Sequence, residues 1–144
     1  MLKGIPAILP AELVKVMMEM GHGDTIVIAD AHFPAYSVGQ RVVDCSGSGA
    51  VDMLNAVLKL FPLDTYVPFR GQLMHTVKGD LDGKDPDIWQ NVTSTYTQND
   101  AEPIFETLER EEFYKTAQKA YAVIRTGETA PYANIILKKG NNCD

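Results

Sequence analysis

Residues 25–29, TIVIA, form an uninterrupted apolar run that is rich in β-branched side chains. Such a run is typical of a strand that is covered on both faces, which requires helices on either side of its sheet. Strands are also expected at 41–45, 72–77, 121–127 and 132–139, and helices at 11–20, 50–61, 87–92 and 111–120. The alternation predicts an α/β fold, a three-layer α/β/α single domain with a central sheet.

The composition is that of a globular domain without a basic surface. Of the 144 residues, 45% are hydrophobic and 22% are charged, so residues 1–144 are expected to form one domain. Thirteen Lys and Arg against nineteen Asp and Glu give a formal net charge of -6, and no basic run is present. A nucleic acid partner is therefore not expected.

The N-terminal segment does not have the pattern of a signal peptide or a membrane span. Glu12, Lys15 and Glu19 interrupt its apolar stretch, and no apolar run reaches membrane-spanning length. Cys45 and Cys143 lack the spacing of a metal or redox motif, which favours reduced thiols. We expect a cytoplasmic protein with no membrane partner.

Four ionisable residues surround the 25–29 run. His22 lies between two glycines, Asp24 precedes the run, and Asp30 and His32 follow it. A carboxylate at the end of a buried strand must find hydrogen-bond donors, either in a turn or in a ligand. Because ligands gather at the carboxyl ends of strands in α/β folds, we expect Asp30, His32 and the loop with His22 to meet there.

These four residues allow two kinds of chemistry. Imidazole and carboxylate are ligands that zinc, iron and manganese accept, but the spacing matches no metal motif, and no metal is expected. Acid-base catalysis is the alternative, because an ordinary histidine gives and takes protons near neutral pH. The chain has no nucleophile elbow, phosphate-binding loop or dinucleotide fingerprint. Proton transfer without a cofactor, such as isomerisation, or simple binding therefore remains.

Polar side chains suited to sugar hydroxyls occur near the end of the chain. Arg110 precedes the last expected helix, and Tyr132 and Asn134 open the last expected strand. Each also has a structural interpretation: a solvated charge, an aromatic residue at the core edge and a turn residue. His75, inside QLMHTV, is expected to be a hydrogen-bonded strand histidine rather than a catalyst.

Two long segments resemble one known family. ELVKVMMEMGHGDTIVIADAHFP and FYKTAQKAYAVIRTGETAPYANIILKKG are similar to the cofactor-independent sugar mutarotases, the family of fucose mutarotases and D-ribose pyranases, and LFPLDTY is similar to the fucose branch. The resemblance implies an RbsD-like fold, a cytoplasmic homo-oligomer that can be a ring-shaped decamer, and an isomerase that interconverts the α and β anomers of a monosaccharide. L-fucose is the sugar that it implies.

The resemblance also assigns roles to single residues. It makes His22 the catalytic proton donor. It places the substrate contacts at Asp30, Arg110, Tyr132, Ala133 and Asn134. His32 favours the fucose type, because the ribose type lacks this histidine, whereas Ala133 stands where some fucose-type members have glycine. The alternatives are a ribose-type mutarotase for another sugar, a non-catalytic monosaccharide-binding protein and a metallohydrolase.

Overall fold

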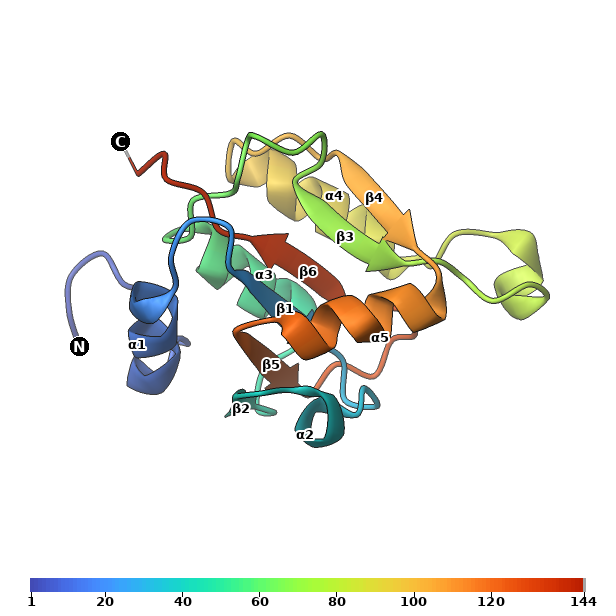
Figure 1. Ribbon diagram of the computed structural model, residues 1–144, viewed down its shortest axis with the longest axis horizontal. Coiled ribbons are helices and arrows are strands. Elements are labelled where there is room, and N and C mark those ends of the chain that lie inside the picture. Colours follow the sequence, from blue (N-terminus) through green and yellow to red (C-terminus); the bar gives the residue numbers. More distant parts are fainter. Residues whose placement is uncertain (144) are drawn as a thin grey trace.

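A six-stranded mixed sheet with the strand order β2-β5-β1-β6-β3-β4 organises the computed structural model, which describes residues 1–143 (Figure 1). The strands are β1 (Thr25–Ala29), β2 (Val42–Cys45), β3 (Gly71–Met74), β4 (Phe105–Leu108), β5 (Ala122–Thr126) and β6 (Ile135–Lys138). The helices are α1 (Ala11–Glu19), α2 (Ala35–Val38), α3 (Ala50–Leu58), α4 (Ile88–Gln98) and α5 (Arg110–Lys119), with the short 3₁₀ helix η1 (Asp80–Gly83).

The direction of the strands defines two edges of the sheet. β5 pairs in parallel with both β1 and β2, and β3 pairs in parallel with β4, whereas β6 is antiparallel to its neighbours β1 and β3. Five strands therefore end at one edge, here called the carboxyl edge, where β6 begins. The opposite edge, where those five strands begin and β6 ends, is called the amino edge.

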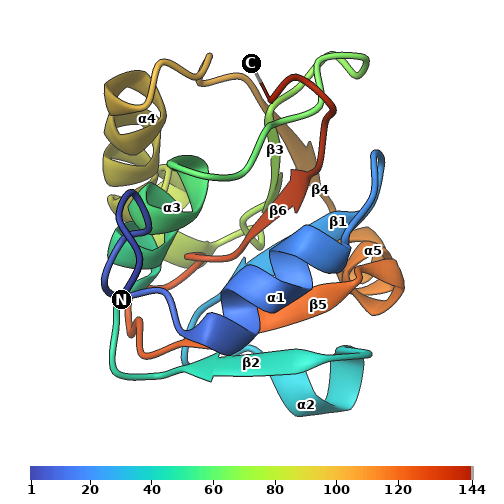
Figure 2. The same ribbon diagram turned by 90° about the vertical axis from the view of Figure 1, so that its left-hand side faces the viewer.

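Helices cover both faces of this sheet, as Figures 1 and 2 show. Side chains alternate along β1, so Ile26 and Ile28 pack in one core with Leu13 of α1 and Met53 of α3. Val27 points the other way, into a second core around α2 and α5. The two cores lie on opposite faces of the strands, which confirms the predicted three-layer α/β/α fold.

The sequence pattern missed elements that depend on distant partners. The 3₁₀ helix η1, helix α2 and strand β4 were not expected, and β4 is a partly polar edge strand that forms by pairing with β3. Helix α4 runs to Gln98, beyond the expected end at residue 92, because its polar second half is held by Tyr96. The Tyr96 side chain is fully buried and its hydroxyl donates to the Arg70 carbonyl at 2.8 Å.

Two sequence expectations concern membrane-spanning helices and the two cysteines. None of the helices in the described residues has the length and apolar character needed to cross a membrane. Cys45 and Cys143 are free thiols. Burial raises the pKa of the Cys45 thiol to about 11, so this sulfur stays protonated and unreactive at neutral pH.

Candidate active site

The residues singled out in the sequence form two separate clusters, one at each end of β1. Asp30 follows the strand at the carboxyl edge, whereas His22 precedes it at the amino edge. The five residues of β1, at about 3.3 Å each, alone separate them by about 16 Å. The expectation that His22 and Asp30 meet at the carboxyl edge is therefore wrong, because an extended strand carries the chain from one edge of the sheet to the other.

At the carboxyl edge, Asp30 and Asn134 form a reciprocal pair. The Asp30 amide donates to Asn134 Oδ1 at 2.7 Å, and Asn134 Nδ2 donates to Asp30 Oδ2 at 3.1 Å. Both residues are buried, at 5% and 6% exposure. The other Asp30 oxygen accepts from the amides of His32 and Phe33 at 3.0 and 2.9 Å. These bonds fix the carboxylate in a turn and leave the His32 residue exposed beside it.

This pair makes a prediction about stability. In Asn134→Ala the buried Asp30 amide loses its acceptor, so we expect the free energy of unfolding to fall by about 1–3 kcal/mol. Urea denaturation measures this loss. The control is Asn91→Ala on the exposed side of α4, which we expect to stay within about 0.5 kcal/mol of the unchanged protein. Equal losses in the two variants would contradict the role given to Asn134.

Tyr132 lies at the same edge in a constrained conformation. Its φ of 60° is in the left-handed region, which costs a residue with a side chain about 1–3 kcal/mol. Trp89 Nε1 donates to the Tyr132 carbonyl at 3.0 Å. The Tyr132 hydroxyl donates to Asp80 Oδ2 at 2.6 Å and accepts from the Val77 amide at 3.0 Å. The bond to Asp80 raises the pKa of Tyr132, so the hydroxyl keeps its hydrogen, which is donated to Asp80.

Arg110 completes the cluster as the first residue of α5, directly after β4 ends. Its guanidinium carbon lies 5.6 Å from the ring centroid of Tyr114, and that ring stacks on Phe33 at 5.4 Å. Phe33 in turn donates its amide to Asp30. An exposed cation is thus connected to the Asp30 turn, and Ala133 is buried between Tyr132 and Asn134 in the chain.

His75 also lies at the carboxyl edge, where it was not expected. It follows β3 instead of lying within a strand, and it is exposed. Its Nδ1 donates to the Thr76 carbonyl at 2.9 Å. The expectation of a histidine inside a strand is wrong because pairing of β3 with β4 ends at Met74 and Leu108.

The amino-edge cluster contains a carboxylate that sequence reasoning missed. His22 Nε2 lies 3.3 Å from Asp64 Oδ1, and the His22 ring meets Tyr66 edge to face at a centroid distance of 4.9 Å. The Asp64 side chain is 4% exposed and that of His22 is 37% exposed. Burial opposes the charge of Asp64, but hydrogen bonds from the Tyr66 amide and from His22 lower the pKa of Asp64 below its ordinary value.

The His22 loop is a tight turn tied to the end of β6. Gly23 has a φ of 90°, and its amide donates to the Lys139 carbonyl at 2.8 Å. The Lys139 amide donates to the Asp24 carbonyl at 2.8 Å, and Asp24 Oδ2 accepts from the Gly21 amide at 2.8 Å. Asp24 therefore stabilises the turn. The four residues of the metal hypothesis divide into two pairs at opposite ends of β1, so they do not converge on one ion.

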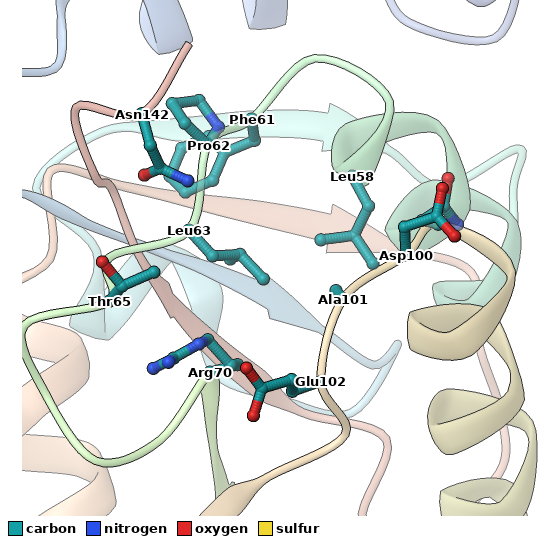
Figure 3. Close-up of a pocket in the computed structure, with 11 residues that line it drawn as sticks. Leu58, Phe61, Pro62, Leu63, Thr65, Arg70, Asp100, Ala101, Glu102 and Asn142 are labelled. Atoms are coloured by element: carbon teal, nitrogen blue, oxygen red, sulfur yellow. The ribbon is translucent and has the colours of Figure 1, made fainter. Parts of the chain in front are cut away.

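A cavity of about 240 Å³ also opens near the amino edge (Figure 3). Its lining comes from residues 58–70, from residues 99–102 and from Asn142. Nη1 of Arg70 donates to the carbonyl oxygens of Asp64, Val67 and Phe69, which shapes the loop that carries the Asp64 side chain. None of the predicted sugar contacts lines this cavity, and we do not assign it to the active site.

Comparison with known proteins agrees with the resemblance. Human fucose mutarotase is 44% identical over 143 residues, covering 96% of this chain and 93% of its own length. The fucose mutarotase of Streptococcus pneumoniae, solved in complex with L-fucose, superimposes with a TM-score of 0.91 at 42% identity and covers 97% of this chain and 99% of that one. Bacillus subtilis RbsD complexed with D-ribose has a TM-score of 0.73 at 28% identity, and the match covers 92% of this chain and 94% of that one.

A family model also matches almost the whole of this chain. The model of the RbsD / FucU transport protein family matches residues 3–142. The match spans both clusters, from the His22 loop to the Tyr132–Asn134 segment, as well as the six strands between and around them. The chain therefore belongs to the RbsD / FucU transport protein family.

Proposed function

We propose that the protein is an L-fucose mutarotase, an isomerase that interconverts the α and β anomers of L-fucose without a cofactor. The observation that carries the proposal is the similarity, over almost the whole chain, to human fucose mutarotase and to the Streptococcus pneumoniae enzyme with bound L-fucose. The ribose-binding relative from Bacillus subtilis is less similar in sequence and in structure. Fucose is thus favoured over ribose.

The chemistry is acid-base opening and closing of the sugar ring. His22 donates a proton to the ring oxygen as the bond between C1 and that oxygen breaks, while the anomeric hydroxyl loses its proton to a base and becomes the aldehyde. Rotation about C1–C2 and closure on the other face give the second anomer. General acid-base assistance contributes about 10²- to 10⁴-fold, which is sufficient for a reaction that already proceeds in water.

The carboxyl-edge cluster has the groups needed to hold the pyranose. The Arg110 guanidinium can donate to sugar oxygens, and the Asp30 carboxylate can accept from sugar hydroxyls. The Tyr132 hydroxyl, whose hydrogen is on Asp80, can accept from a sugar hydroxyl. Asn134 and the turn amides keep that carboxylate in place. We assign substrate binding to this cluster, with Ala133 as part of the wall and His32 as a contact that selects fucose.

The separation of the clusters bears on assembly. One chain cannot bring His22 to a sugar held by Asp30, because β1 lies between them. We therefore propose a homo-oligomer in which His22 of one copy completes the carboxyl-edge cluster of another, with the ring-shaped decamer as its form. His22 and Tyr66 are exposed at the amino edge, where a second copy can reach them. The free cysteines suit a cytoplasmic location.

The second candidate is a non-catalytic monosaccharide-binding protein. It is favoured by one observation, which is that the carboxyl-edge cluster contains sugar-binding groups without help from His22. Such a protein would bind fucose and leave the anomer exchange rate unchanged. A ribose-type mutarotase would accelerate exchange of ribose more than that of fucose.

Saturation-transfer NMR on the anomeric protons separates these functions. We expect catalytic amounts of the protein to accelerate exchange between the α and β signals of L-fucose, and to do so more than for D-ribose. Faster exchange with D-ribose would move the protein to the ribose type. Sugar binding without faster exchange of either sugar would reject the mutarotase and favour the binding protein.

A further inference from the structure

His22, the proposed acid, contacts the buried carboxylate of Asp64, and the reaction described above gives this carboxylate no role. We infer that Asp64 is a positioning residue for His22: it holds the Nε2 side of the ring and leaves Nδ1 as the nitrogen that exchanges a proton with the sugar. The inference rests on the proposed function, in which His22 is the proton donor, and adds a residue and an atom to it.

Asp64 is held firmly enough to orient another side chain. Its amide donates to the Lys138 carbonyl of β6 at 2.9 Å, and its carbonyl accepts from Arg70 at 3.3 Å. Its Oδ1 accepts from the Tyr66 amide at 3.0 Å in addition to contacting His22. The Asp64 backbone is therefore fixed on both sides and its carboxylate is held by the Tyr66 amide, whereas the His22 ring is more than one-third exposed.

The chemistry of the contact determines which ring nitrogen carries the hydrogen. An ionised carboxylate only accepts hydrogen bonds, so His22 Nε2 must be the protonated nitrogen in the neutral ring. Nδ1 then has the free lone pair. In the protonated ring, Nδ1–H gives its proton to the sugar ring oxygen, the C1–O electron pair moves to that oxygen, and the neutral ring that remains keeps Nε2–H on Asp64.

The charged groups around this pair leave the contact intact. Lys138 attracts the Asp64 carboxylate, and Arg70 donates to backbone carbonyls through Nη1. Two further carboxylates are near His22 in the chain: Asp24 accepts from the Gly21 amide, and Glu19 accepts from the Tyr121 hydroxyl. The Tyr66 ring, edge to face with that of His22, restricts ring rotation further. Asp64 is thus the carboxylate in hydrogen-bond contact with His22.

Two variants of Asp64 and one control test the inference. Asp64→Ala removes the acceptor and the charge, whereas Asp64→Asn keeps an acceptor oxygen and removes only the charge. Asp24→Asn removes a neighbouring charge that does not contact the ring. Each oligomeric protein is labelled with ¹⁵N-histidine, and the ring N–H signals and the rate of L-fucose exchange at several sugar concentrations are measured.

We expect a protected Nε2–H signal of His22 in the unchanged protein and in Asp24→Asn, and its loss to solvent exchange in Asp64→Ala. The maximal exchange rate should fall at least about 10-fold in Asp64→Ala and less in Asp64→Asn, with the half-saturating fucose concentration unchanged, because Asp64 orients the acid and does not touch the sugar. Asp24→Asn should retain its rate.

These measurements test the positioning role of Asp64 separately from the mutarotase function. A protected signal on Nδ1 instead of Nε2, or full activity in Asp64→Ala, would overturn the positioning role while leaving the mutarotase intact. Absence of anomer exchange in the unchanged protein would reject the proposed function, and the ring N–H signals would still show whether Asp64 holds the ring.

Discussion

His22→Ala should lose the acceleration of L-fucose anomer exchange, a drop of about 10²- to 10⁴-fold that returns the rate toward the uncatalysed reaction. The loss arises from chemistry and not from misfolding, because the exposed turn that carries His22 is held by backbone hydrogen bonds and by Asp24, and Asp64 keeps its bond from the Tyr66 amide when the ring is removed. Saturation-transfer NMR gives the rate, and urea denaturation should show a free energy of unfolding lowered by only about 1 kcal/mol, for the lost contact with Asp64.

The same variant tests whether two copies share each site. Co-expression of His22→Ala with Arg110→Ala should restore activity, because random assembly gives about a quarter of the sites an intact His22 from one copy and an intact carboxyl edge from another. Co-expression of Arg110→Ala with Tyr132→Phe is the matched control, since both changes affect the same edge and no site is whole. Restoration in neither mixture would contradict a shared site.

The layers of the fold could be predicted because their signals are local. The apolar run at residues 25–29 and the helical spacing in residues 11–20 reappear as β1 and α1. Strand β4 could not be found in this way, because its residues become a strand only through pairing with β3, more than thirty positions earlier in the chain. Local periodicity contains no information about such a partner.

The candidate site could be predicted only where its residues flank apolar strands. Asp30 and Asn134 are separated by 104 positions, yet both flank apolar strands, and the structure pairs them at the carboxyl edge. Asp64 lies 42 positions from His22 in an irregular segment, and no periodic signal marks it. The edge of His22 was misjudged because His22 precedes β1 and Asp30 follows it, and an extended strand places these two ends at opposite edges of the sheet whatever the strand order.

Asp30 should be the most sensitive position at the carboxyl edge, because stability and binding both depend on one carboxylate. It accepts hydrogen bonds from the His32 and Phe33 amides and from Asn134 Nδ2. In Asp30→Ala these donors lose a charged acceptor, and we expect the free energy of unfolding to fall by about 3 kcal/mol. L-fucose exchange should fall to the background rate. Urea denaturation and saturation-transfer NMR measure the two effects.

An exchange of the two side chains separates stability from sugar binding. Asp30→Asn turns an NH₂ group toward Asn134 Nδ2, and Asn134 cannot flip in response because its Oδ1 accepts from the Asp30 amide. Adding Asn134→Asp supplies an acceptor at that place, so the double variant should recover about 1 kcal/mol or more over Asp30→Asn alone. It should remain inactive if the sugar requires a carboxylate at position 30. Recovery of fucose exchange together with stability would mean that Asp30 serves only the turn.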